Sequence, residues 1–286
     1  IPYCFATMEV RERMFCRLWL GINLWMQRLG GAASAYSGHS LAFQEIYGYN
    51  GNPMPCFVPG TFNAAEEDGQ WNPSMPAHTV AILPKHTTGG GVSASAGYKV
   101  AHWDEARHFI MFHPDMPTEP RRIRSIAHEV GHVFGMLHEH QRSDRDNYIE
   151  VQFFAMKGYD DALARAIADG HSQADAKRRL EQDEDFARHY DAVTDQFMKP
   201  VGGKLGGLSD EYFVDESQPF DLDSIMLYNS QNSAEYFQSA AINMEDATIL
   251  KWEKDHQGNR IGTSIIKPNM VPSAGDVAWI RRNYPW

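Results

Sequence analysis

Cysteine, basic charge and long apolar runs are all scarce in this sequence. Three cysteines occur in 286 residues, so at most one internal disulfide can form. Lysine and arginine number 26 against 37 aspartates and glutamates, and the net charge of −11 argues against a nucleic-acid partner, because polyanions require a basic surface. The apolar segment from Met14 to Met26 is interrupted by Arg17 and Asn23, and no run approaches the roughly 20 residues that cross a bilayer. We therefore expect neither nucleic-acid binding nor a membrane span.

The three cysteines, Cys4, Cys16 and Cys56, leave two interpretations open. In the first, two of them form a bridge and the third is a buried thiol. In the second, one cysteine is a reversible zinc ligand in a latent form, since thiolate binds zinc well. The chain begins with Ile1 and not with methionine, which indicates a processed or trimmed product.

The first half of the chain is expected to mix helix and strand. From Glu9 to Leu29, apolar residues recur at helical spacing, which predicts a long amphipathic helix. Short apolar segments separated by proline, glycine and asparagine predict strands. These segments are Ile1–Phe5, Ser40–Tyr47, Val80–Leu83 and Gly91–His102.

The second half is expected to be mainly helical. A helix should begin after Pro120 and run from Arg121 to about Phe134. Helical spacing also predicts helices with solvated faces between Phe154 and Pro200, followed by a flexible stretch at Gly202–Gly207. A last helix from Ser273 to Arg282 has a serine at the position that caps helices. No internal repeat is present.

Three histidines stand at spacings typical of a zinc site. His128 and His132 are four residues apart, so on a helix they lie one turn above each other and can bind one zinc ion. In a continued helix His138 would lie about 9 Å further along the axis and point away. Gly135 can adopt a left-handed conformation at low cost, which lets the chain turn back and bring His138 to the metal. We expect one zinc ion held by His128, His132 and His138.

Glu129 follows the first of these histidines and is the candidate general base. Three neutral imidazoles leave the fourth zinc position for water, as in catalytic sites. Zinc lowers the pKa of that water to about 7, and a nearby carboxylate can take its proton and pass it to a leaving amine. The alternative of three unrelated histidines on a buried helix gives no packing reason for the intervening glutamate and glycine.

The segment from His128 to Asp146 reads HEVGHVFGMLHEHQRSDRD. It resembles the signature HExxHxxGFxHExxRxDRD of the astacin family of metzincin zinc proteases. Only Met136 differs, standing where the signature has phenylalanine, and both are bulky apolar residues. The resemblance implies zinc-dependent hydrolysis of peptide bonds with Glu129 as general base.

A second segment, Ser224 to Tyr228, reads SIMLY and resembles the methionine turn SxMHY of astacins. The resemblance implies that Met226 lies beneath the zinc site. It also implies that Tyr228 binds the metal at rest and stabilises the oxyanion during turnover. Leu227 stands where the family has histidine. In an unrelated chain, both Met226 and Tyr228 would by default be structural residues.

The resemblance implies an α+β fold, a metzincin-like two-lobed catalytic domain. Its N-terminal part would hold a twisted mixed sheet with two long helices, and its C-terminal lobe would consist of loops and helices. We expect one catalytic domain over residues 1–286, with subdomains 1–138 and 139–286 and a helical insertion near 154–207. The segment Gly91–Tyr98 falls where the family has the edge strand that holds substrate, although it is also compatible with a flexible glycine loop.

Three further features depart from the family. The stretch between His138 and Met226 is longer than is typical, with the insertion around Phe154–Gly207. The family's usual four cysteines are not reproduced, so its disulfide pairing cannot be transferred. Glu139 is expected either to meet the amino terminus through water, as the family would imply, or to pair with Arg142 or another arginine.

The expected function is that of a secreted, extracellular zinc endopeptidase that cleaves protein or peptide substrates, with the chain expected to be a monomer. The alternative is a zinc-containing secreted binding or toxin module with little or no turnover. A matrix-type metzincin is disfavoured by Tyr228 and the run 139–146, and a serralysin type by the lack of glycine-aspartate repeats.

Overall fold

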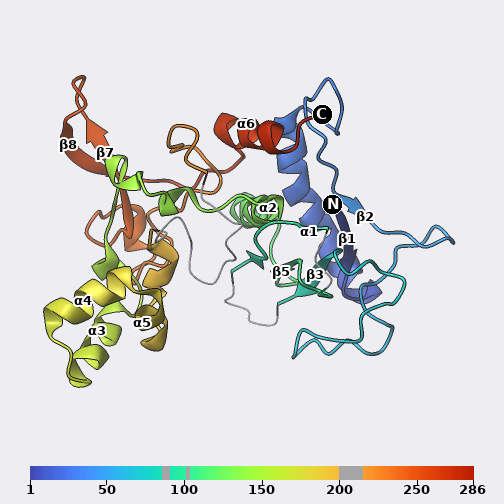
Figure 1. Cartoon of the computed structure of the whole chain (residues 1–286), viewed down its shortest axis with the longest axis horizontal. Coiled ribbons are helices and arrows are strands. Elements are labelled where there is room, and N and C mark those ends of the chain that lie inside the picture. The colour runs from blue at the N-terminus through green and yellow to red at the C-terminus, as the bar shows by residue number, and fades with distance from the viewer. Residues whose placement is uncertain (86–90, 101–103, 200–214) are drawn as a thin grey trace. The chain divides into compact units, whose positions relative to one another are not determined.

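The computed structural model describes residues 1–85, 91–100, 104–199 and 215–286 (Figure 1). These residues form two compact units. The first unit comprises Ile1–Met136, Asp223–Ile225 and Met270–Trp286, and the second comprises Leu137–Leu222 and Met226–Asn269. The expected flexible stretch Gly202–Gly207 and the end of the expected strand at His102 lie outside the described residues.

The first unit is built on a five-stranded sheet in the order β2-β1-β3-β5-β4. Its strands are β1 (Pro2–Phe5), β2 (Gln44–Glu45), β3 (Val80–Pro84), β4 (Ser93–Ala94) and β5 (Phe109–Phe112). All neighbours are parallel except β4, which runs antiparallel to β5 at the edge. Every residue of β3 is buried, as expected for the central strand of a parallel sheet. The predicted mixed sheet is confirmed, although the strands predicted at Ser40–Tyr47 and Gly91–His102 are much shorter than expected.

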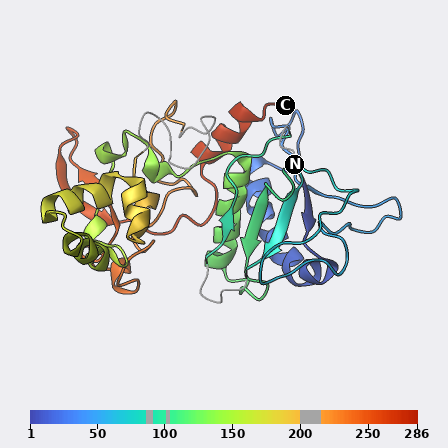
Figure 2. The same ribbon diagram turned by 60° about the horizontal axis from the view of Figure 1, so that its bottom comes forward.

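Two long helices, α1 (Met8–Leu29) and α2 (Pro120–Phe134), pack next to this sheet (Figure 2). Helix α1 begins at Thr7, whose hydroxyl accepts a hydrogen bond from the Val10 amide. The buried stripe of α1 faces α2, and the indole of Trp25 donates a hydrogen bond to the carbonyl of Ala127 (2.7 Å). The stripe consists of Met14, Leu18, Gly21, Trp25 and Leu29. Both helices were predicted from the sequence within one residue of their ends.

Gly21 lies where α1 packs closely against α2. A Cβ atom at this position would lie 2.6 Å from Cγ2 of Ile126 and 3.2 Å from the amide nitrogen of Ala127. We expect Gly21→Ala to lower the free energy of unfolding by about 1–3 kcal/mol, because overpacking outweighs the helix propensity of alanine. Urea denaturation measures the change. Gly262→Ala, where the added atom meets nothing within 4 Å, is the matched control, and an equal loss in both variants would contradict this interpretation.

The second unit contains helices and a small antiparallel sheet in the order β6-β7-β8. Helices α3 (Tyr159–Ala168), α4 (Gln173–Gln182) and α5 (Glu184–His189) lie in the predicted helical region. The sheet consists of β6 (Ile149–Val151), β7 (Ile249–Lys254) and β8 (Arg260–Ile265), and the sequence did not predict it. The unit therefore holds more than the expected loops and helices. Short 3-10 helices complete it: η1 (Glu139–Gln141), η2 (Arg145–Asn147), η3 (Phe153–Ala155), η4 (Val193–Phe197) and η5 (Ser239–Ala241).

The cysteines correct one expectation and support another. Cys4 and Cys56 form a disulfide inside a core cluster of the first unit, so the predicted single bridge is present. The remaining Cys16 is exposed and free, so the expectation of a buried thiol was wrong. The reason is its place on α1, two residues from both Met14 and Leu18, which turns it away from the buried stripe. Within the described residues no helix is both long enough and apolar enough to cross a membrane.

Candidate metal centre

The end of helix α2 sets the direction of the chain beyond His132. Gly135 has a left-handed conformation, with φ of 102°, and its amide donates to the carbonyls of Gly131 and His132. A residue with a Cβ is strained in this conformation, which explains the glycine. The prediction that α2 ends here through a left-handed glycine is confirmed.

The structure brings together the three histidines that the sequence singled out. One donor atom from each of His128, His132 and His138 lies within 4.8 Å of the other two. The Nδ1 atom of His128 is hydrogen-bonded to the carbonyl of Ile225 and that of His132 to the carbonyl of Met136, both at 2.8 Å. The Nδ1 atom of His138 lies 3.1 Å from the side-chain oxygen of Gln141.

These contacts fit a zinc ion. A histidine that donates its Nδ1–H to an oxygen carries its lone pair on Nε2, which is the usual arrangement around zinc. Burial lowers the pKa of His132 to about 4, so this imidazole is neutral and competent to bind metal at neutral pH. The three histidines thus form a candidate zinc-binding site.

Glu129 lies on the same helix in a confined environment. Its side chain is buried, with 8% of the residue exposed, and desolvation raises the pKa of its carboxyl group to about 8. The positive charges of Arg124 and Lys85 and a hydrogen bond from the backbone of Ala94 act in the opposite direction. A divalent cation nearby would lower this pKa further, because it favours the ionised form. The pKa of Glu129 is therefore set by the balance between its burial and the positive charges around it.

The edge strand β4 lies against the same helix. Its residue Ala94 provides the backbone hydrogen bond to Glu129, and the amide of Gly97 just after it donates to the carbonyl of His132 (2.8 Å). The residues Ser93–Ala94 form the antiparallel edge of the sheet. An edge strand is therefore present within Gly91–Tyr98, as one of the two interpretations expected, and its binding of substrate stays a prediction.

A buried aspartate connects the last helix, α6 (Ala274–Asn283), to the first histidine. Asp276 is 2% exposed and accepts hydrogen bonds from the hydroxyl of Ser224 (2.7 Å) and the amide of Ile225 (2.8 Å). The carbonyl of Ile225 in turn accepts from both His128 and Arg124 at 2.8 Å. Asp276 thus fixes the peptide unit that orients His128. The sequence predicted the serine cap of α6 but gave no sign of this contact.

We expect Asp276→Asn to disturb this connection. The new amide group can accept at one atom only and points a donor at the Ser224 hydroxyl or the Ile225 amide. The free energy of unfolding should fall by about 1–3 kcal/mol, and zinc affinity by up to about tenfold. Zinc affinity is measured by competition with a chromophoric chelator. Asp161→Asn, an exposed carboxylate on α3, is the control, and unchanged affinity in Asp276→Asn would remove it from the support of the site.

Tyr228 lies beside the third histidine. Its ring centre is 4.4 Å from that of His138 and 4.2 Å from that of His140, with which it stacks. Its phenolic oxygen donates a 3.4 Å hydrogen bond to the side chain of Gln196 in η4. Nothing in the sequence marked Gln196 as a neighbour of Tyr228, because η4 is distant along the chain.

The residues before Tyr228 are buried. Met226 is buried, and its carbonyl accepts a hydrogen bond from the amide of Glu139 (3.3 Å). Leu227 packs in the hydrophobic core of the second unit, which explains why an apolar residue stands where the astacin signature has histidine.

The Glu139 carboxylate lies 3.3 Å from the guanidinium of Arg142, which is the second of the two arrangements expected for Glu139. The amino group of Ile1 donates to the carbonyl of Ala42.

Comparison with known proteins agrees with the motif. Residues 119–174 match the family model "Astacin", which describes a family of peptidases. The resemblance to the astacin family is confirmed. A stretch of 75 residues, 26% of this chain, is 39% identical to 14% of the mouse (Mus musculus) "Astacin-like metalloendopeptidase". A stretch of 26 residues, 9% of the chain, is 65% identical to 10% of "Astacin-like metalloprotease toxin 2" from Loxosceles intermedia. The matched stretches thus span a small part of these astacin relatives.

The fold is also that of a known zinc protease. The hatching enzyme zinc-protease "High choriolytic enzyme 1" from Oryzias latipes aligns over 98% of this chain and 86% of its own, with a TM-score of 0.50 and 14% identity. At this identity the similarity shows the fold alone, and it confirms the predicted α+β, metzincin-like fold class.

Proposed function

We propose that the chain is a zinc-dependent endopeptidase that hydrolyses peptide bonds in proteins with Glu129 as general base. One observation carries the proposal: three histidines gather their donor atoms within 4.8 Å on and just after a helix that also carries a buried glutamate. The astacin match supports it, since it covers this same segment. We also propose that residues 1–286 act as one catalytic domain with subdomains 1–138 and 139–286 and an insertion near 154–207.

The side chains have distinct roles in this proposal. A zinc ion held by the histidines would supply Lewis-acid polarisation of a carbonyl oxygen and a water of lowered pKa. Glu129 takes a proton from the attacking water and delivers it to the leaving amine, a role suited to a buried carboxyl group that follows the first metal ligand on the same helix. Strand β4, at the edge of its sheet, is the element along which an extended substrate backbone would bind.

Tyr228 is proposed as a metal ligand at rest and as the donor to the oxyanion, supported by its position 4.4 Å from the ring of His138. We expect Tyr228→Phe to lower kcat by about 100-fold, because the ring contacts with His138 and His140 remain while the hydroxyl is lost. KM should change much less. Steady-state kinetics on a fluorogenic peptide measure both constants, and an unchanged kcat would exclude Tyr228 from catalysis.

We further propose that the protein acts outside the cell as a monomer. The Cys4–Cys56 disulfide supports an oxidising environment. The names of two similar proteins, a toxin and a hatching enzyme, agree with secretion.

A peptide-library digest read by mass spectrometry tests the proposed function. The full chain loaded with zinc should cleave internal peptide bonds, a chelator should abolish cleavage and added zinc should restore it. Cleavage that survives the chelator would contradict a metal-dependent mechanism. Absence of cleavage in the zinc-loaded chain would favour the alternative, a secreted binding or toxin module.

A further inference from the structure

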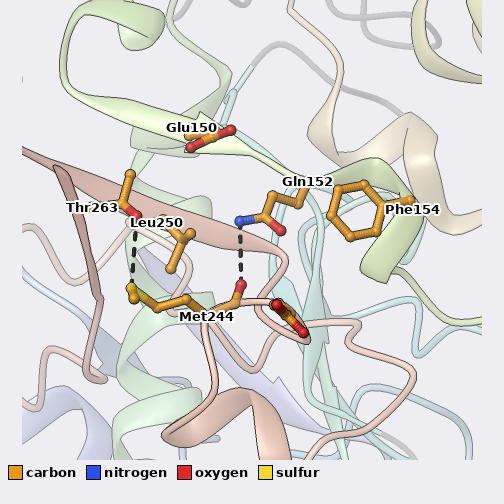
Figure 3. Close-up of a pocket in the computed structure, with 7 residues that line it drawn as sticks. Glu150, Gln152, Phe154, Met244, Leu250 and Thr263 are labelled. Carbon is orange, nitrogen blue, oxygen red and sulfur yellow. Dashed lines mark hydrogen bonds between the residues drawn. The ribbon is translucent and has the colours of Figure 1, made fainter. Parts of the chain in front are cut away.

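The second unit has a hollow of about 420 Å³ that includes none of the zinc-site residues (Figure 3). Its floor is one face of the β6-β7-β8 sheet. Glu150 of β6 is directly opposite Leu250 of β7. Thr263 of β8 is opposite Trp252, which shares the face of Leu250 because it is two residues further along the strand. Side chains from all three strands therefore line the same hollow.

The rim of the hollow is apolar and open to solvent. Leu250 is buried at the floor, whereas Phe154 and Met244 are 57% and 45% exposed. The side chain of Gln152 donates to the carbonyl of Met244 (3.2 Å), and the hydroxyl of Thr263 lies 3.6 Å from its sulfur, as Figure 3 shows. These two contacts hold Met244 at the rim. Exposed large apolar side chains at a hollow are typical of a binding surface.

Two carboxylates border this apolar surface. Glu150 and Glu245 both line the hollow, and across the described ranges neither carboxylate has a hydrogen bond or ion pair. In contrast, the neighbouring Glu253 on β7 pairs with Lys251 (3.1 Å) and accepts from Ser264 (2.5 Å). The carboxylates of Glu150 and Glu245 are therefore available to pair with a cationic group of a partner. The net charge of −11 adds to the attraction of a cationic partner.

We propose that this hollow is an exosite that binds a lysine or arginine side chain of the polypeptide substrate. The aliphatic stem of such a side chain lies along Leu250 and Phe154, and its cationic head meets Glu150 and Glu245. The ring of Phe154 adds a cation–π contact. The exposed Phe154 and Met244 can also contact residues on either side of the basic residue, which favours a polypeptide over a small free amine. The proposal rests on the proposed endopeptidase function, because it takes the bound polypeptide to be a substrate of the enzyme.

Binding is tested without turnover in the full, zinc-loaded chain carrying Glu129→Gln. The probe is a fluorescein-labelled 12-residue peptide with one central lysine between leucine and phenylalanine, and the matched peptide has glutamine in place of lysine. We expect lysine-to-glutamine replacement to weaken binding by about five- to tenfold, measured by fluorescence anisotropy. In the E150Q/E245Q variant the two peptides should bind equally. The energetic coupling between the lysine of the peptide and the two carboxylates is then lost.

The control is the D160N/D161N variant, which removes two exposed carboxylates of α3 and the same total charge. It should retain the full preference for lysine. Equal loss of preference in both variants, or equal binding of the two peptides to the unmodified exosite, would overturn the proposal. Thermal unfolding of each variant verifies that the fold is intact.

A second arm separates the exosite from the catalytic proposal. In the enzyme with Glu129 intact, E150Q/E245Q should raise KM for the lysine peptide by about five- to tenfold and leave kcat unchanged. A fall in kcat with KM constant would contradict an exosite. If the chain prefers the lysine peptide, and E150Q/E245Q removes that preference, but the chain cleaves nothing, binding of a basic side chain at the hollow stands and the proposed endopeptidase function fails.

Discussion

Glu129→Gln should lower kcat for peptide cleavage by about 100-fold to 10,000-fold while the protein stays folded and binds zinc. Glutamine keeps the size of the side chain and a hydrogen-bond acceptor for the Ala94 backbone, but it cannot take a proton. The loss should therefore appear in the chemical step and not in metal affinity. Steady-state kinetics and zinc analysis of the same preparation measure the two effects.

Glu66→Gln provides the matched control, since Glu66 is exposed in the same unit. It should have the activity of the unchanged protein. Retained activity in Glu129→Gln with zinc bound would remove Glu129 from the mechanism. Loss of zinc from that variant would instead indicate that the carboxylate supports the metal.

His138→Ala should weaken zinc binding by at least about 100-fold and abolish cleavage at limiting zinc, because it removes one of three proposed ligands. The other two histidines remain on α2, so the fold of the first unit should persist. Competition with a chromophoric chelator measures the affinity. His256→Ala, an exposed histidine between β7 and β8, should have no effect. Equal zinc affinity in His138→Ala and the unchanged protein would mean that the metal, if bound, uses other residues.

The sequence predicted the parts of the site that depend on local spacing. The four-residue interval between His128 and His132 is a property of one helix, and the left-handed Gly135 is a property of one helix end. Both are encoded within a few residues, and both are present in the structure. The close agreement for α1 and α2 has the same origin, since periodic apolar residues define a helix face without reference to the rest of the chain.

The parts that were not predicted depend on contacts between distant segments. Asp276 accepts a hydrogen bond from the amide of Ile225, and Gln196 accepts one from the hydroxyl of Tyr228. The partners are far apart in the sequence, so no local pattern predicts these contacts. Strand β5 is a short apolar run that periodicity cannot distinguish from a buried helical segment. Strands β7 and β8 are partly exposed and carry charged residues, so they lack the apolar pattern that predicts a buried strand. The turn between them at residues 255–259 is nevertheless typical of a hairpin and could have indicated them.

The central claim is that His128, His132 and His138 bind one zinc ion, with the chain reversed at Gly135. Anomalous diffraction from crystals of the full chain loaded with zinc, collected on both sides of the zinc absorption edge, tests it most directly. The account predicts one anomalous peak per chain, about 2.0–2.1 Å from a nitrogen of each of the three histidines. A peak elsewhere, or a zinc ion with the imidazole of His138 turned away from it, would contradict the account.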